Sequence, residues 1–349
     1  MNKRITIKEI ALLADVSIGT VDRVLHDRGR VAKATGERIL KIAQDGNYSS
    51  NLFARNLKLG RTFKIAVLVP SDNYFGRMLL QGIAQGIEDY SSFGFYQKDF
   101  LTIGARNSLT PPGWSIETAL ANSPDALILS SKFLMKEKRA IEMLEQSGVP
   151  CITLGSNLQS IERLFSIGHD SYQSGLLGAR LLDPGYGRRA EVFIVTLDEE
   201  DLLNRMVSER VTGFKKYFDK NKSSSVYIHD INLEFDDLPI ADLKQELLNL
   251  KHPIHAFIPS HKPHLLLNEL REIKKELYLR SVVYDLLPEN VALLRNNTLD
   301  FIIHHKPKMQ GYLAVQTLYR KFVLGDDIPP SQYISSDVIT NENFKWAQQ

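Results

Sequence analysis

The chain lacks features that several common classes of protein require. Its 349 residues include a single cysteine, Cys151, so an intrachain disulfide is excluded, and no CxxC pair or Cys/His cluster indicates a zinc site. No run approaches the roughly eighteen apolar residues of a membrane-spanning helix. The first residues, MNKRITIKEIALLADV, contain no uninterrupted apolar segment like that of a secretion signal. We therefore expect a cytoplasmic protein without metal or membrane contact, in which Cys151 is a buried core thiol.

The motifs of common enzymes are missing as well. The first predicted strand continues as VLVPSDNYFG, which has no GxGxxG loop, and the chain has no Walker A loop, no GxSxG and no HExxH. Scattered carboxylates alone do not define an acid–base pair. The sequence therefore predicts neither an enzyme nor a bound cofactor.

The N-terminal region contains three short helical patterns with a tight break between the first two. We expect the first helix over residues 6–14, where Thr6 and Glu9 form a capping box. Ser17 is the expected N-cap of the second helix, and the third should cover residues 33–45. Such a pattern is typical of a helix-turn-helix, whose second helix enters the major groove of DNA.

Apolar spacing separates the inner and outer faces of these helices. In the second helix Val21, Val24 and Leu25 should face inward. The residues expected to face solvent or DNA are Ile18, Gly19, Asp22, Arg23 and His26. The expected buried stripe of the third helix is Ile39, Leu40, Ile42 and Ala43.

Charge is unevenly distributed along the chain. Residues 1–61 contain twelve Lys and Arg against six Asp and Glu, although the net charge of the whole chain is only +2. A basic head on a slightly acidic body is expected of a DNA-binding module joined to a globular domain. The alternative, a solvated three-helix bundle that binds nothing, is disfavoured by the charge, the turn and the caps together.

The head resembles that of the LacI/GalR family of transcriptional repressors. The resemblance rests on TIKEIALLADVSIGTVDRVL and on residues 47–57, NYSSNLFARNL, and it continues more weakly through the body. It implies a sequence-specific DNA-binding regulator that acts as a repressor. It also implies a homodimer whose heads bind the two halves of a near-palindromic operator in double-stranded DNA.

The resemblance further implies a hinge helix over residues 50–58 that folds on the operator. Leu57 would then insert between base pairs in the minor groove and kink the duplex. The alternative is that Leu57 belongs to an ordinary linker helix. The expected DNA-contacting residues are Thr6, Ser17, Ile18, Gly19, Thr20, Asp22, Arg23, His26, Arg30, Tyr48, Asn51, Ala54 and Leu57.

The head departs from the family pattern where bases are usually read. Ile18 and Gly19 occupy those positions, and neither side chain can form a hydrogen bond with a base edge, although Ile18 could contact a thymine methyl group. Base recognition should therefore depend on Arg23, assisted by Asp22, His26 and Arg30. Because of these departures the operator sequence is not predictable.

From Phe63 onward, strand-like runs alternate with helical stretches. The run at 64–70 precedes a helical pattern at 76–90, and later helices are expected at 208–219 and 263–276. Alternation of this kind predicts parallel sheets covered by helices on both faces, and the number of units calls for two lobes. The body resembles the periplasmic-binding-protein type 1 fold. The expected fold class is thus an α-helical helix-turn-helix head with a hinge helix, followed by a two-lobed α/β domain.

The resemblance implies that the chain passes between the lobes three times. The crossings are expected near residues 168–170, 305–307 and 335–337. The expected limits are 1–48 for the DNA-binding domain, 49–61 for the hinge and 62–349 for the effector-binding and dimerisation domain, with lobe 1 at about 62–168 and 307–335 and lobe 2 at about 170–304 and 337–349.

Ligands of such domains bind at the carboxyl ends of the strands, between the lobes. The resemblance implies that an aromatic ring stacks on a sugar, that Arg210 donates to sugar hydroxyls and that Asp285 accepts from two of them. The effector is therefore expected to be a carbohydrate or a derivative of one. The expected contacts are Asn73, Tyr74, Phe75, Ser131, Arg210, His261, Asp285 and His305.

Each of these residues also has a purely structural interpretation. Tyr74 and Phe75 could pack the lobes together, and Arg210 could pair with a glutamate of its own helix. Asp285 could cap a helix, which is the usual role of Asp after a strand.

The histidines could serve structure or ligand binding. His261 and His305 stand where amides are common in the family, which would suit an anionic effector and make binding depend on pH between 6 and 8. The alternative is that they are structural.

The predicted function is a DNA-binding regulator whose operator affinity depends on a small molecule. The alternative is a solute-binding protein of a transport system, in which the body binds a ligand without regulating transcription. The DNA-binding head and the missing secretion signal argue against that alternative.

Overall fold

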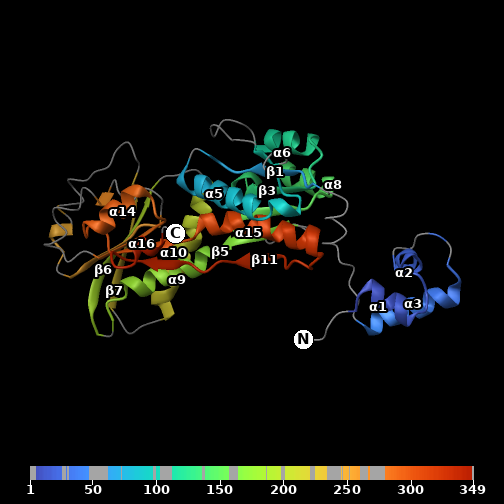
Figure 1. Cartoon of the computed structure of the whole chain (residues 1–349). Coiled ribbons are helices and arrows are strands. Elements are labelled where there is room, and N and C mark those ends of the chain that lie inside the picture. The colour runs from blue at the N-terminus through green and yellow to red at the C-terminus, as the bar shows by residue number, and fades with distance from the viewer. Residues whose placement is uncertain are drawn as a thin grey trace. The chain divides into compact units, whose positions relative to one another are not determined.

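The computed structural model divides the chain into two compact units, Met1–Leu59 and Gly60–Gln349, each described here by itself (Figure 1). The residues that the structure describes are 5–25, 29, 31–46, 62–71, 73–96, 100–102, 112–135, 138–156, 164–185, 187–197, 201–220, 225–233, 245, 247–250, 252–259, 266–267 and 280–347.

The described residues of the N-terminal unit form three helices, α1 (Ile7–Leu13), α2 (Ile18–Leu25) and α3 (Lys33–Asp45). The predicted capping box is present, because the Glu9 amide donates to Thr6 Oγ1 at 3.3 Å and the Thr6 amide donates to Glu9 Oε2 at 2.7 Å. Ser17 Oγ accepts from the Thr20 amide at 3.2 Å and so caps α2. These caps begin the helices at the residues that the sequence predicted.

The small core of this unit is formed by one apolar side of each helix. Ile10, Val21 and Ile39 are fully buried at its centre. Leu40 was expected in the same stripe, but 53% of its surface is exposed, so that expectation was wrong. Ile39 and Ala43 are four residues apart and share the buried face of α3. Leu40 is rotated by about 100° from Ile39 around the helix axis and therefore lies outside that face.

In the larger unit, the strands that the structure describes form two six-stranded sheets. In spatial order, the first consists of β11 (Ser331–Tyr333), β5 (Leu164–His169), β4 (Cys151–Ser156), β3 (Ala126–Ser130), β1 (Ile65–Leu68) and β2 (Phe100–Thr102). The second consists of β12 (Asp337–Ile339), β10 (Phe301–His304), β9 (Arg280–Tyr284), β8 (Ile254–Phe257), β6 (Arg189–Leu197) and β7 (Ser225–Leu233). Every pairing is parallel except that of β12 with β10. The predicted two-lobed α/β architecture is therefore confirmed.

Helices cover these sheets and bury strands that are apolar throughout. The central strands β1, β3 and β8 have no exposed residue, as expected for parallel sheets covered on both faces. Cys151 is buried in β4, and burial raises the pKa of its thiol to about 12. The covering helices are α5 (Tyr74–Asp89), α6 (Pro112–Ala121), α7 (Lys132–Met135), α8 (Lys138–Ser147), α9 (Ser171–Leu182), α10 (Asp201–Lys220), α14 (Pro288–Arg295), α15 (Pro307–Tyr319) and α16 (Phe344–Ala347).

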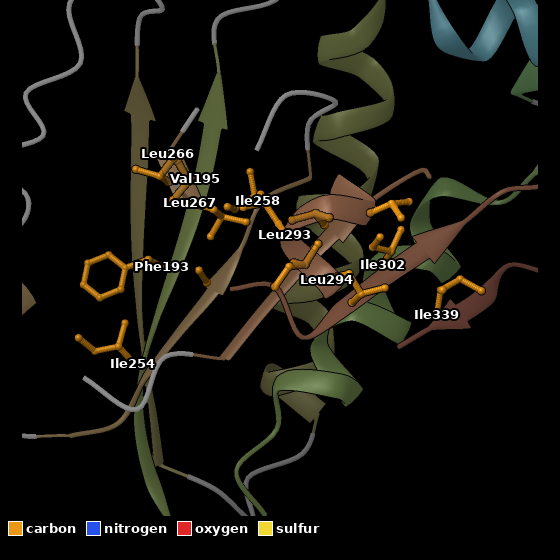
Figure 2. Packing of buried hydrophobic residues seen from close by; sticks show 14 of the residues in the cluster. Phe193, Val195, Ile254, Ile258, Leu266, Leu267, Leu293, Leu294, Ile302 and Ile339 are labelled. Atoms are coloured by element: carbon orange, nitrogen blue, oxygen red, sulfur yellow. The ribbon is translucent and has the colours of Figure 1, made fainter. Parts of the chain in front are cut away.

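The main apolar cluster of the second lobe fills the space between its sheet and α14 (Figure 2). Phe193 and Ile254 contribute from the strands, and Leu293 and Leu294 contribute from the helix. Within the described part of the chain, no helix has the length and apolar character needed to cross a bilayer.

The two lobes exchange helices because the chain passes between the sheets. Helix α9 follows β5 of the first sheet but packs on α10 of the second lobe, whereas α15 follows β10 of the second sheet and packs beside α5 of the first (Figure 1). The third passage lies between β11 and β12. All three passages connect directly to the carboxyl ends of strands.

Glycines allow both helix pairs to pack closely. A Cβ atom on Gly82 of α5 would lie 1.8 Å from the Lys308 oxygen of α15, and one on Gly175 of α9 would lie 2.0 Å from the Arg210 oxygen of α10. No side chain fits at such distances, so the backbones themselves are in contact.

Candidate functional site

The outer face of α2 is the candidate nucleic-acid surface of the N-terminal unit. Gly19 and Arg23 are exposed, Ile18 is 50% exposed and Asp22 is half-buried. Ser17 Oγ lies 2.9 Å from the Thr20 hydroxyl, and the Thr6 hydroxyl donates to Glu9, so these hydroxyls stabilise the helix starts. The predicted residues His26, Arg30, Tyr48, Asn51, Ala54 and Leu57 lie outside the described part of the chain.

The second candidate site lies at the carboxyl ends of the strands of the large unit. Asp285 directly follows β9, is 1% exposed and has a left-handed backbone with φ of 65°. Its amide donates to the Ile303 oxygen at 3.0 Å. The N-cap of α14 is Leu287, so Asp285 is not the helix cap that one interpretation suggested.

Arg210 lies beside the same strand ends. It is 1% exposed, its Nη1 donates to the Pro259 oxygen at 2.7 Å, and its guanidinium carbon lies 3.9 Å from the centre of the Tyr284 ring. The glutamate next to it in sequence, Glu209, pairs with Arg205 at 3.2 Å. Arg210 therefore occupies the interior face of α10 and reaches the ends of β8 and β9.

His305 occupies the passage from β10 to α15 and contacts residues of two other segments. Its Nδ1 lies 3.5 Å from Asp285 Oδ1. Its ring stacks on His169, the last residue of β5, with the ring centres 3.6 Å apart, and its ring centre also lies 5.3 Å from that of Tyr284. Asp285, Arg210, Tyr284 and the two imidazoles thus form one buried group.

The first lobe contributes aromatic and hydroxyl groups. Tyr74, at the start of α5, packs against the apolar cluster of the second lobe. Burial raises the Tyr74 pKa to about 12, and the negative charge of Asp285 contributes to this shift. Tyr74 therefore joins the lobes, as one interpretation suggested, and also borders the buried group.

Three of the remaining predicted residues, Asn73, Phe75 and Ser131, follow strands β1 and β3 of the first sheet. Asn73 caps α5 by accepting from the Gly76 amide at 2.8 Å. Ser131 is buried, and a Cβ atom on Gly155 would lie 3.2 Å from its hydroxyl and 4.0 Å from a ring carbon of Phe75. Ser131 and Phe75 therefore both lie beside Gly155. His261 lies outside the described part of the chain.

Sequence reasoning missed two members of the buried group. Tyr284 immediately precedes Asp285, and its ring faces the Arg210 guanidinium. His169 lies within residues 168–170, where the sequence predicted that the chain crosses between the lobes. Its position could therefore have identified it as a candidate site residue. Burial raises the Tyr284 pKa to about 12.

Burial controls the charge of the two histidines after β10. It lowers the pKa of His305 from its usual 6.5 to about 4, although Asp285 acts in the opposite direction, and Arg210 and His304 lower it further. Burial also lowers the pKa of His304. His305 is therefore neutral between pH 6 and 8, and the expected pH-dependent attraction of an anion by this residue is not supported.

This shift predicts a loss of stability in acid. The unfolded chain binds a proton at His305 as the pH falls through 6.5, but the folded chain does not until about pH 4. The free energy of unfolding should therefore fall across that interval, by up to on the order of 3 kcal/mol. In urea unfolding at pH 7.5 and 4.5, His305→Gln should lose less stability than the unchanged chain. An equal loss in both would contradict the assignment.

Comparison with known proteins supplies two family matches. Residues 6–51 match the model of bacterial regulatory proteins of the lacI family, and residues 114–325 match the periplasmic binding protein domain. The HTH-type transcriptional regulator IdnR of Escherichia coli (strain K12) is 31% identical over 173 residues, which is 50% of each chain. The match thus spans half the length of that relative.

Two solved structures have the same fold. A putative LacI transcriptional regulator from Bacteroides fragilis aligns with a TM-score of 0.68 at 22% identity, over 82% of this chain and 99% of that one. GanP, a glucose-galactose binding protein from Geobacillus stearothermophilus, aligns with a TM-score of 0.63 at 20% identity, over 81% and 98%.

Proposed function

The chain belongs to the lacI family of bacterial regulatory proteins, and we propose that it is a transcriptional repressor whose affinity for operator DNA is set by a small carbohydrate bound between two lobes. One observation supports this most directly. The chain that contains a capped helix-turn-helix also contains a buried group of Asp285, Arg210 and His305 where parallel strands end.

The buried group suits a neutral, hydroxyl-rich ligand. Asp285 can accept from hydroxyls and Arg210 can donate to them, and both are fixed by the surrounding backbone. Asp285 and Arg210 have opposite charges and His305 is neutral, so these three residues together have no net charge to attract an ion. We assign Tyr74, Phe75 and Ser131 to the opposing wall of the cleft, and we propose that His261 also contacts the effector.

Control of DNA binding requires that the ligand favour one of two lobe arrangements. All three passages between the lobes begin at strand ends; one starts at His169 and another contains His305, both members of the buried group. A ligand at Asp285 would therefore act directly on the segments about which the lobes move. We further propose that residues 1–48 bind DNA, that 49–61 form the hinge and that 62–349 bind the effector and dimerise.

The remaining features of the proposal follow from the family. A near-palindromic operator requires a twofold dimer, and the protein acts in the cytoplasm without catalytic activity. A solute-binding protein is the second candidate, favoured by the likeness of the body to GanP. The helix-turn-helix argues against this second candidate, because a solute-binding protein of a transport system does not require a DNA-binding domain.

The test is selection of genomic DNA fragments by the purified full chain. An enriched palindrome beside genes for carbohydrate use would support the repressor and narrow the effector to metabolites of that pathway. If no fragment is enriched, with or without added sugars, the regulatory function is contradicted and the solute-binding alternative becomes preferred.

Replacement of Arg23 tests the assignment of base recognition. Arg23→Ala should relax discrimination at one base position of the selected site by about tenfold or more, because an arginine contact to a base edge is worth roughly 1–3 kcal/mol. Lys41→Ala, an exposed lysine of α3, should change affinity equally for all sequences. Competition binding with single-base variants of the site measures both. Uniform weakening by Arg23→Ala would make it a phosphate contact.

A further inference from the structure

Two strands of the second sheet end in turns where a residue other than glycine has a left-handed backbone. Asp285 follows β9 with φ of 65°, and Lys306 follows His305 after β10 with φ of 52°. This conformation is disfavoured for any residue with a Cβ atom, so neighbouring groups must stabilise it. The two turns present Asp285 and His305, whose Oδ1 and Nδ1 lie 3.5 Å apart.

A fully buried amide side chain spans each turn. Asn290 of α14 donates through Nδ2 to the carbonyl oxygens of Tyr284 and Asp285, both at 3.0 Å. Gln310 of α15 donates through Nε2 to the carbonyl oxygen of His305 at 2.8 Å. Asn290 lies five residues after Asp285 and Gln310 lies five residues after His305. In both turns, a buried amide side chain therefore donates to a backbone carbonyl of the residue five positions earlier.

The bonded carbonyls determine the backbone dihedrals of the turns. The carbonyls of Tyr284 and Asp285 belong to the two peptide planes that flank the Asp285 Cα, so holding both oxygens fixes φ and ψ of that residue. The His305 carbonyl belongs to the plane before Lys306 and fixes the start of that turn in the same way. The direction of the Asp285 carboxylate and of the His305 ring follows from these dihedrals.

We propose that Asn290 and Gln310 are positioning residues that hold Asp285 and His305 in their binding geometry. This inference rests on the proposed function, since it assigns the two turns to the effector cleft. Neither amide need touch the ligand, because each acts through the residue that it positions. Gln310 also ties the passage between the lobes to α15, while Asn290 belongs to the second lobe, so the Asp285–His305 contact depends on both.

Hydrogen exchange of the ligand-free full chain tests the proposal without any effector. The quantity measured is the exchange rate of the Asp285 amide, which donates to the Ile303 oxygen. Asn290→Ala should speed it about tenfold, because two buried carbonyls lose their donor. Ser281→Ala is the matched control, since this buried hydroxyl donates to Asp300 at 3.0 Å at the opposite end of β9. It should change the rate less than about twofold.

Repeating the Asn290→Ala measurement in a chain that also has Asp285→Gly shows whether Asn290 holds the left-handed turn or only stabilises the lobe in general. Glycine adopts a left-handed backbone without strain, so in an Asp285→Gly background Asn290→Ala should speed exchange at position 285 by only about twofold. Equal acceleration in both backgrounds would reduce Asn290 to a general stabiliser and overturn the proposal. An unchanged rate in the Asn290→Ala chain would overturn it as well.

Measurement of ligand affinity tests whether the two amides also matter for binding. The probe is whichever of D-arabinose, D-glucose and D-galactose most raises the melting temperature of the full chain. Asn290→Ala and Gln310→Ala should each weaken its binding about tenfold, and Ser281→Ala should leave the dissociation constant unchanged. Unchanged affinity in the amide variants would overturn the positioning role. If the chain binds none of these sugars but Asn290→Ala still speeds exchange of the Asp285 amide as expected, the positioning role of the amides is supported. Only the proposed class of effector is then contradicted.

Discussion

Asp285→Asn is expected to abolish the response to the effector while leaving DNA binding intact. The substitution keeps the shape of the side chain but removes its charge, and hydrogen bonds from ligand hydroxyls to a carboxylate are worth about 1.5–3 kcal/mol each. Loss of two such bonds should lower effector affinity roughly 100-fold or more. Titration calorimetry with the effector and anisotropy with the selected DNA measure the two properties separately.

The control for Asp285→Asn is another buried carboxylate of the same lobe. Glu191 of β6 is 8% exposed and lies 2.7 Å from His229, near the amino end of its strand and away from the cleft. Glu191→Gln should therefore alter stability without altering effector affinity. If both variants lose affinity equally, the effect arises from weakening of the lobe, and Asp285 is not a ligand contact.

The same variant has a second, ligand-free readout. The Asp285 charge helps to raise the Tyr74 pKa to about 12, so neutralising that charge should lower the Tyr74 pKa toward its usual 10. Difference absorbance of the phenolate during alkaline titration, with Tyr74→Phe to identify the signal, measures the change. An unchanged Tyr74 titration would show that the two groups are not close in solution.

Helix starts were predictable because local groups determine them. Thr6, Glu9 and Ser17 satisfy the first amides of their own helices, so their positions can be recognised from a few residues of sequence. The Asp285 turn could have been read in the same way. Pro288 is the first residue of α14, which makes Leu287 the cap and leaves Asp285 outside the helix.

The sequence predicted only the later part of α10, in which a functional residue interrupts the apolar pattern. The helix was expected to begin at residue 208, but it covers Asp201–Lys220. Its buried side includes Val207, Arg210 and Phe214, so an arginine occupies a position where the spacing calls for an apolar residue. A charged residue within a buried stripe lowers the helical signal, and it is itself a signal of a binding site.

Contacts between distant segments were not predictable from one sequence. His169 and His305 stack although 135 residues separate them, and nothing local to either histidine indicates the other. The edge strands β11 and β12 have three residues each, too few for a periodic pattern. Their positions depend on the sheets that they join, so the candidate site was predicted one residue at a time and not as a group.

Gly82→Ala is expected to destabilise the first lobe strongly, against the usual preference of helices for alanine. Alanine favours a helix over glycine by about 1 kcal/mol, but a Cβ atom on Gly82 would lie 1.8 Å from the Lys308 oxygen. Helices α5 and α15 would have to separate, at a cost of about 3 kcal/mol or more. The melting temperature of the large unit should fall by roughly 10 °C, as measured by differential scanning calorimetry.

Two further substitutions decide whether the close approach of the helices is the cause. Gly311→Ala places a Cβ atom 2.1 Å from the Leu79 oxygen in the same helix pair, so it should destabilise the large unit to a similar extent. Gly36→Ala in α3 meets nothing within 4 Å and should stabilise the N-terminal unit by roughly 0.5–1 kcal/mol. Because α15 begins just after His305, a separated helix pair should also weaken effector binding. A stable Gly82→Ala chain with normal effector affinity would contradict the backbone contact between α5 and α15.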